Sequence, residues 1–250
     1  MKTAAFCLLS LLAVSSRAQQ TPVNSDVYAA KKVGNTTAFI LSGSTRFLEM
    51  LEINSITLAP NAIAKGHQRH DDVEELIIIK SGTLTVAQGN TAQAIGPGSV
   101  ALTLPGEVHS LANMSNTPVT FYVLTYQSNE KPNGGRGENS GGSFILDSNT
   151  IAFREHDKGG IRRYYDRPTT MFERMEMHVT TLNAGLSSHD PHTHKADEII
   201  LMMKGEGEMY IDGSRKRVTE GSLVFLGSMV PHAITNTGSG PCEYFTFQWE

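Results

Sequence analysis

Short runs of apolar, β-branched and aromatic residues recur along the chain, separated by Gly, Asn, Ser and Pro. Runs of this length and composition predict β-strands. The clearest are Leu84–Val86, Val100–Leu104, Phe121–Tyr126, Glu198–Met203, Glu208–Ile211, Leu223–Leu226 and Tyr244–Trp249. No segment keeps an apolar period of about 3.6 residues for long enough to form a major helix. The pattern therefore predicts an all-β fold, a sandwich or a barrel.

The second half of the chain repeats the first at an offset of about 123 residues. The matched pairs include Glu198 and Glu75, Gly205 and Gly82, Gly221 and Gly98, His232 and His109, and Asn236 and Asn113. Upstream of the acidic residue the offset becomes about 124, which places His194 on His70 and His192 on Gln68. Internal similarity of this kind indicates two copies of one β-unit.

The repeat predicts two tandem domains. We expect an N-terminal barrel over 19–127, a flexible linker over 128–143 and a C-terminal barrel over 144–250. The linker contains Gly134-Gly135-Arg136-Gly137 and Gly141-Gly142, a composition typical of flexible polar segments. It lacks the Gly-Lys-Ser/Thr ending of a phosphate loop, which argues against nucleotide binding.

The first residues have the pattern of an export signal. Lys2 is followed by an apolar run over 4–14 and then by Ser16-Arg17-Ala18, with small residues before a cleavage point. This order of basic, apolar and small-residue segments is typical of a secretory signal peptide. We therefore expect a signal peptide over 1–18, cleavage near Ala18, and a secreted or periplasmic location.

Charge and cysteine content exclude several classes of protein. The net charge of −4 argues against a nucleic-acid partner held by a basic surface. No apolar run reaches the roughly 18 residues of a membrane-spanning helix, so no membrane span is expected. Cleavage of the signal peptide would remove Cys7 and leave Cys242 alone, which excludes an internal disulfide.

Seven of the nine histidines fall in or beside two clusters at matching places in the two repeats. His192 and His194 are two residues apart, so on a strand they would point to the same face. Glu198 follows them, and His232 comes after a later turn. Three imidazoles and a carboxylate suit Mn, Fe, Zn, Ni or Cu. A set of surface histidines is the alternative, but the matched spacing favours a metal site.

At this point the chain resembles the cupin superfamily. The second repeat reads His-x-His-x3-Glu-x6-Gly over 192–205, followed by Gly221 and then Pro231-His232-x3-Asn236. The first repeat reads His70-x4-Glu75-x6-Gly82, followed by Gly98 and then Pro105-x3-His109-x3-Asn113. The resemblance covers about 45–127 and 170–250. It implies a bicupin, which is two jelly-roll β-barrels in one chain.

The resemblance implies a metal-ligand set for each barrel. In the C-terminal barrel the set is His192, His194, Glu198 and His232; in the N-terminal barrel it is Gln68, His70, Glu75 and His109. Gln68 stands where a histidine is expected, and an amide oxygen binds borderline metals more weakly than imidazole does. We expect one divalent metal ion in the C-terminal barrel and leave a weaker second ion in the N-terminal barrel open. Glu74 competes with Glu75 as the carboxylate, and the offset favours Glu75.

Three further features leave alternatives open. Arg174, Glu176, His178 and Thr180 alternate with Met175, Met177 and Val179, and we expect the apolar set to line the barrel, so that His178 is not a ligand. Arg162 or Arg163 could hold a substrate carboxylate, but we favour a strand that packs across the other barrel or a second subunit. His189 is either a partner of the metal ligands, such as a proton shuttle, or a solvated turn residue.

Neither the fold nor the metal determines a reaction, because cupins include dioxygenases, isomerases, decarboxylases, hydrolases and storage proteins. We expect a metal-dependent enzyme that acts on a small polar metabolite, such as a sugar, keto acid or carboxylate. Glu198 is then a ligand and, once released from the metal, the catalytic base. The layout also resembles ureidoglycine aminohydrolase, whose ligand pattern differs. The alternatives are a non-catalytic binding protein for a sugar or acid and a structural or storage bicupin. Homo-oligomerisation is left open.

Overall fold

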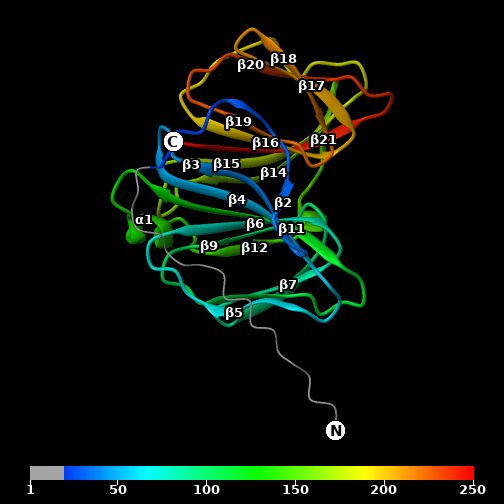
Figure 1. The fold of residues 1–250 in the computed structure, drawn as a ribbon. Helices are drawn as coiled ribbons and strands as arrows, with labels where there is room; N and C mark the ends of the chain where they lie inside the picture. Colours follow the sequence, from blue (N-terminus) through cyan, green and yellow to red (C-terminus); the bar gives the residue numbers. More distant parts are fainter. Residues whose placement is uncertain (1–19) are drawn as a thin grey trace.

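The computed structural model describes residues 20–250, in which two large β-sheets face each other and each carries a small sheet on its outer side (Figure 1). The expected all-β fold with two barrels is confirmed. The predicted signal peptide over 1–18, with Cys7, lies outside the described residues. Within the described part of the chain, no helix is long and apolar enough to cross a membrane.

The N-terminal barrel consists of a seven-stranded and a four-stranded sheet. The large sheet has the order β12 (Phe144–Leu146), β9 (Val100–Thr103), β6 (Glu74–Ser81), β11 (Val119–Ser128), β4 (Leu48–Leu58), β3 (Thr37–Gly43) and β2 (Lys31–Lys32). The small sheet has the order β5 (Ile63–Gln68), β10 (His109–Ala112), β7 (Leu84–Gln88) and β8 (Thr91–Ile95).

The C-terminal barrel consists of a seven-stranded and a three-stranded sheet. The large sheet has the order β1 (Asp26–Tyr28), β19 (Leu223–Leu226), β16 (Asp197–Lys204), β21 (Cys242–Trp249), β15 (Met175–Leu182), β14 (Gly159–Arg167) and β13 (Arg154–His156). The small sheet has the order β18 (Ser214–Thr219), β17 (Glu206–Ile211) and β20 (His232–Asn236). A 3-10 turn, η1, spans Ser148–Thr150.

Strand pairing crosses the domain boundaries that the repeat suggests. The early strand β1 pairs antiparallel with β19 of the C-terminal half, and β12 pairs antiparallel with β9 of the N-terminal half. Each large sheet thus takes an edge strand from the other half of the chain. The repeats at 19–127 and 144–250 are therefore not closed units in the structure.

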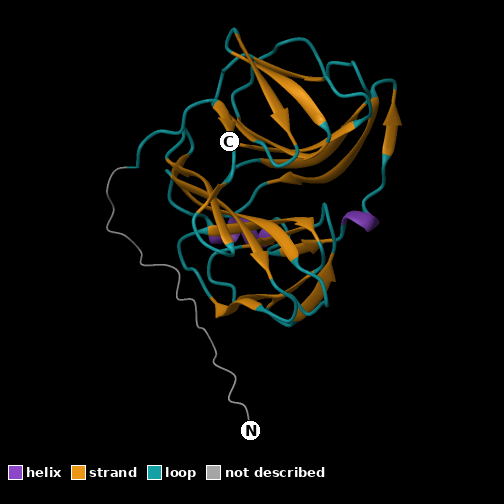
Figure 2. Cartoon of the chain, turned by 45° about the vertical axis from the view of Figure 1, so that its right-hand side comes forward, coloured by secondary structure: helices purple, strands orange, loops and turns teal. Residues whose placement is uncertain are grey.

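The segment 128–143, expected to be a flexible linker, contains the short helix α1 (Gly134–Asn139), one of the helical pieces drawn in purple in Figure 2. The Arg136 side chain donates hydrogen bonds to the carbonyl oxygens of Thr169 (2.9 Å) and Thr170 (3.1 Å). Gly137 is buried against Thr170, whose hydroxyl would lie 2.2 Å from a Cβ there. The glycines of this segment thus allow close packing as well as turning, which composition alone does not distinguish.

Each large sheet is buried on both faces. Ile200 and Met202 of β16 lie in the apolar core of the C-terminal barrel, whereas Ile199 and Leu201 lie in a core shared by the two large sheets. Since successive side chains on a strand point to opposite faces, both sets can be buried at once. The shared core, which includes Trp249, packs the two barrels into one body.

The same geometry overturns one expectation, which concerns the set of β15 side chains that faces the interior of the barrel. Met175, Met177 and Val179 lie in the shared core, and the intervening His178 and Thr180 line a cavity in the barrel. The expectation that the apolar set lines the barrel was wrong, because these residues have a second apolar core to enter.

The matched glycines of the repeats close the turns after β6 and β16. Gly82 and Gly205 have positive φ values of 78° and 79°. A Cβ would lie 2.4 Å from the Pro118 carbonyl oxygen at Gly82 and 3.0 Å from the Cys242 Cα at Gly205. Both the backbone conformation and the close approach require glycine.

Two buried carboxylates connect the halves reciprocally. Glu74 on β6 accepts a hydrogen bond from the Met171 amide of the C-terminal half at 3.1 Å. Asp197, its counterpart on β16, has hydrogen bonds from Thr45 and the Phe47 amide of the N-terminal half. Burial raises the pKa of Glu74 to about 7 and also raises the pKa of Asp197.

Glu74 should make the stability of the protein depend on pH. Its pKa rises from the ordinary value of 4.5 to about 7 on folding, so the free energy of unfolding falls as the pH rises through this range. Glu74→Gln cannot ionise and should be more stable than the wild type by about 3 kcal/mol at pH 8, but by under about 1 kcal/mol at pH 5. Denaturant unfolding of both proteins in chelator, at both pH values, measures this. An equal difference at the two pH values would contradict the assignment.

Candidate metal centre

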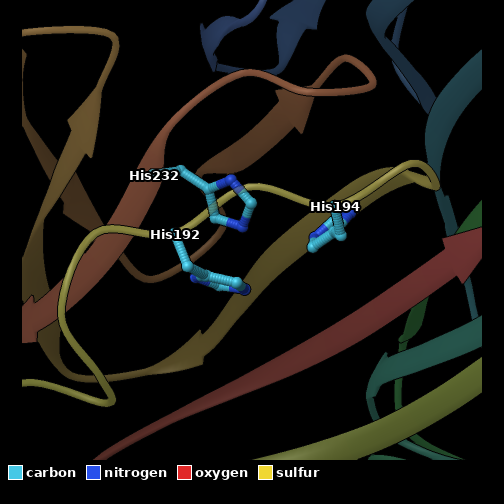
Figure 3. Close-up of side chains that lie close together, drawn as sticks. All are labelled: His192, His194 and His232. Carbon is cyan, nitrogen blue, oxygen red and sulfur yellow. The ribbon is translucent and has the colours of Figure 1, made fainter.

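Three histidines of the C-terminal barrel turn their rings toward one common space (Figure 3). One ring nitrogen from each of His192, His194 and His232 lies within 4.8 Å of the others. His232 begins β20, whereas His192 and His194 lie in the loop before β16. The sequence interpretation placed the latter two on one face of a strand. The structure brings them together from a loop instead.

Backbone hydrogen bonds hold this loop against β20. The His192 amide donates to the His232 carbonyl oxygen at 3.2 Å, and the His232 amide donates to the His192 carbonyl oxygen at 3.0 Å. The Met229 amide donates to the His194 carbonyl oxygen at 2.8 Å. The relative positions of the three rings are thus fixed by main-chain contacts as well as by side-chain packing.

Glu198, the second residue of β16, completes the cluster. Its Oε2 lies 2.8 Å from His194 Nε2 and 3.2 Å from His232 Nε2, and it accepts a hydrogen bond from Gln248 Nε2 at 3.1 Å. The carboxylate is almost completely buried. All four residues expected as C-terminal ligands therefore lie together.

The second nitrogens of two rings determine which atoms face the centre. His194 Nδ1 lies 2.9 Å from the Ala196 carbonyl oxygen, and His232 Nδ1 lies 2.8 Å from the Val230 carbonyl oxygen. A carbonyl oxygen only accepts, so Nδ1 carries the proton in each neutral ring. The Nε2 lone pairs then face the Glu198 carboxylate. The lone pairs and the carboxylate oxygen are all acceptors and repel one another. The arrangement is therefore favourable only when protons or a metal ion supply positive charge between the Nε2 atoms and the carboxylate.

The pKa shifts reflect the same electrostatics. Burial acts to raise the pKa of Glu198, but the hydrogen bonds with His194 and His232 outweigh it and lower the pKa to about 2. The contact with Glu198 raises the pKa of His194, whereas burial and the neighbouring rings lower the pKa of His192. A divalent cation satisfies all of these groups at once, and imidazole with carboxylate suits borderline divalent metals. The residues therefore fit a bound metal ion.

A second, less complete cluster occupies the matching place in the N-terminal barrel. Ligand atoms of His70, Glu75 and His109 lie within 4.8 Å of one another, and His109 Nε2 lies 3.0 Å from Glu75 Oε1. Gln68 on β5 is the register partner of His109, as His192 is of His232. Among the described residues the buried Gln68 Oε1 has no hydrogen-bond partner. Glu74 faces the shared core instead, so Glu75 is the carboxylate at this cluster.

A cavity of about 300 Å³ adjoins the C-terminal cluster. His192, Glu198 and His232 line one part of it, and His178 and Thr180 of β15 line another. The sequence interpretation did not place His178 in the cavity. Polar and apolar residues alternate along its strand, and this pattern fits either set facing the interior of the barrel. The sequence interpretation also missed His156, the last residue of β13, and Lys158 in the turn that follows. Both line the cavity, and neither belongs to a motif.

The other candidates fall into different places. Tyr164, in the basic stretch of β14, donates to the Gly98 carbonyl oxygen of the other half at 2.9 Å, and Arg162 Nη1 lies 3.8 Å from a Glu243 carboxylate oxygen. This strand thus packs across the other barrel, and neither Arg162 nor Arg163 lines the cavity. His189 does line it, with its ring centroid 4.0 Å from that of His192 in an edge-on contact.

Comparison with known proteins adds a family and several folds. A protein-family model described as "Cupin domain" matches residues 54–125 and 178–247. AerE from Microcystis aeruginosa is similar in structure, with a TM-score of 0.67 and 13% identity over 93% of this chain and 100% of that chain. A putative glyoxylate-induced protein from Pseudomonas aeruginosa has a TM-score of 0.69 and 15% identity, over 89% of this chain and 83% of that chain. An oxalate decarboxylase from Lactobacillus farciminis, in a formate complex, has a TM-score of 0.68 and 12% identity, over 91% of this chain and 87% of that chain. At these identities the structural matches show the fold alone.

The two clusters should differ in metal affinity, since the C-terminal one offers three imidazoles and the N-terminal one offers two. His194→Ala should therefore remove more bound metal than His70→Ala when the proteins are purified without chelator and their metal content is measured. His156→Ala, which changes the cavity wall outside the cluster, should keep the wild-type content. Loss of most metal in His70→Ala, with little loss in His194→Ala, would show that the principal site lies in the N-terminal barrel and that our assignment is wrong.

Proposed function

The chain belongs to the cupin family, with two copies of the domain, and we propose that it is a metal-dependent enzyme that acts on a small polar metabolite in its C-terminal barrel. The metabolite is a sugar, a keto acid or a carboxylate. The observation that carries this proposal is the cluster of His192, His194 and His232 with Glu198 on the wall of a cavity. A cluster that only stabilised the fold would not need an adjoining cavity.

The four residues would hold one Mn, Fe, Zn, Ni or Cu ion, which would supply Lewis-acid chemistry on a substrate oxygen or, as iron, oxygen chemistry. The chain's own residues do the rest. Ile200 and Ile234 give the cavity apolar walls that limit access of water, and the backbone contacts of His192 and His232 keep the ligand geometry preorganised.

Glu198 is proposed first as a ligand. Its pKa of about 2 makes it a weak proton acceptor while His194 and His232 contact it. A role as catalytic base therefore requires its release from these contacts. In the N-terminal barrel we propose a weaker second metal site at Gln68, His70, Glu75 and His109, in which the buried amide oxygen replaces one imidazole.

The structural neighbours support an enzyme at the level of fold. One of them is an oxalate decarboxylase whose crystal structure contains formate, so a barrel pair of this kind can accommodate a small carboxylate. This is a property of that protein, and for the present chain it supports a proposal only.

We also propose that the chain is exported, with cleavage near Ala18. The support is the order of Lys2, the apolar run over 4–14 and Ser16-Arg17-Ala18.

Turnover tests the proposed activity. Protein loaded separately with each of the five metals is incubated with a panel of sugars, keto acids and small carboxylates, and the reactants are followed by proton NMR. At least one compound should be consumed, and His232→Ala should slow this by at least about 100-fold, since loss of even an outer partner of a metal ligand costs about 10- to 100-fold. His70→Ala, in the other barrel, should change the rate little. No consumption by any metal form, or an unchanged rate in His232→Ala, would refute the proposal.

Mass spectrometry tests the export proposal. Protein recovered from the exported fraction should begin near Gln19 and carry an unmodified thiol at Cys242, which is a buried free cysteine in the structure. Recovery of the intact chain from Met1 in the cytoplasmic fraction alone would contradict it.

A further inference from the structure

A second polar group lies in the cavity, away from the three histidines. His178 on β15 lines the cavity, and its Nδ1 lies 3.3 Å from Oε1 of Glu176, two residues earlier on the strand. Both side chains are largely buried, at 16% and 14% exposure. Since Glu176 engages Nδ1, Nε2 is the remaining polar atom of the ring.

Glu176 is itself fixed by arginines. Arg174 donates to its Oε2 at 2.7 Å, and Arg163 on β14 lies 3.6 Å from its Oε1. The interaction with His178, together with Arg174, lowers the pKa of Glu176, so this carboxylate is ionised at neutral pH. The ionised carboxylate beside Nδ1 therefore orients the His178 ring.

The N-terminal barrel provides an internal comparison. Its residues at the places of Glu176 and His178 are Glu52 and Asn54, and Asn54 Nδ2 donates to Glu52 Oε1 at 2.7 Å. The corresponding carboxylates thus accept a hydrogen bond from an amide in one barrel and lie beside an imidazole in the other.

The surroundings of this position differ between the barrels in the same way. Where the N-terminal barrel has Ile56, Phe121 and Val123 in its apolar core, the C-terminal barrel has Thr180, Tyr244 and Thr246 around its cavity. The imidazole therefore accompanies the polar cavity. The glutamate contact is common to both barrels.

Sheet register gives the separation of the strands that carry His178 and Glu198. His178 is the register partner of Thr246 on β21, which is the partner of Ile200 on β16, two residues after Glu198. Adjacent strands lie about 4.8 Å apart, so the two groups stand on strands roughly 10 Å apart. A small molecule within the cavity can reach both.

The charge of the cavity favours an anion. Lys158 lines it, and its Nζ donates one hydrogen bond to the Ser188 carbonyl oxygen at 3.0 Å, which leaves two N–H groups. Glu198 is the only acid among the described residues that line the cavity, and His194 and His232 already contact it. A bound divalent ion would add further positive charge.

We propose that the C-terminal cavity takes a small two-ended anion, a dicarboxylate or an oxo- or hydroxy-carboxylate, with one end at the metal cluster and the other held by His178 and Lys158. Glu176 is the positioning residue for His178. This inference rests on the proposed function, because it requires a metal ion at one end.

Calorimetry with simple probes tests the inference. Full-length protein loaded with zinc, which has no redox chemistry, is titrated at pH 6.5 with acetate, malonate and succinate. The dicarboxylates should bind more tightly than acetate. His178→Asn, which can keep the glutamate contact as Asn54 does, should weaken binding of the preferred dicarboxylate by at least about tenfold, the value of one charge-assisted hydrogen bond. Its zinc content and its affinity for acetate should not change.

Two further variants separate ligand contact from a general effect on the barrel. Lys158→Met should also weaken dicarboxylate binding selectively, and Asn54→Ala, the matched change in the other barrel, should leave it unchanged. Equal dicarboxylate binding by His178→Asn and the wild type, or no dicarboxylate binding by the zinc-loaded wild type, would overturn the inference alone. Absence of zinc from the C-terminal barrel, measured before titration, would overturn the proposed function and the inference with it.

Discussion

The two large sheets are buried on both faces, and most of the molecule follows from this constraint. One face of each sheet packs into a core shared by the barrels, and the other faces the interior of its own barrel. The adjacent pair of acids on β6, like the pair on β16, therefore sends one carboxylate to each side of its sheet. Glu74 and Asp197 contact the other half of the chain, whereas Glu75 and Glu198 face the histidine clusters.

The C-terminal cluster is organised by its hydrogen bonds to the backbone. The Ala196 and Val230 carbonyl oxygens hold Nδ1 of His194 and His232, so that both Nε2 atoms face one buried carboxylate. Such a group of acceptors needs a cation at its centre. The N-terminal cluster keeps the carboxylate and two histidines, but its barrel interior is filled by residues such as Phe121 and Val123. The two barrels thus share a candidate ligand cluster but differ in the residues that fill the barrel interior.

Much of the fold could be predicted from the sequence, because the spacing of four residues is a pattern typical of cupins. This pattern predicts both a β-barrel and its candidate metal ligands, which are His192, His194, Glu198 and His232. Local pattern could not show the exchange of β1 and β12, since a strand of three residues finds its partner through tertiary contacts. Nor could it show which face of β15 points into the barrel. Both faces of that strand are buried, and the alternation of His178 with Met177 is compatible with either face pointing inward. Lys158 is outside any motif and reaches the cavity only through the turn after β13.

The most direct test of this account is anomalous diffraction, at metal absorption edges, from crystals of protein purified without chelator. The account predicts a peak among the ring nitrogens of His192, His194 and His232, next to the Glu198 carboxylate, with equal or higher occupancy than any peak at His70, Glu75 and His109. A well-occupied peak in the N-terminal barrel with none in the C-terminal barrel would contradict it, as would three C-terminal histidines that contact only Glu198 and water in metal-supplemented crystals.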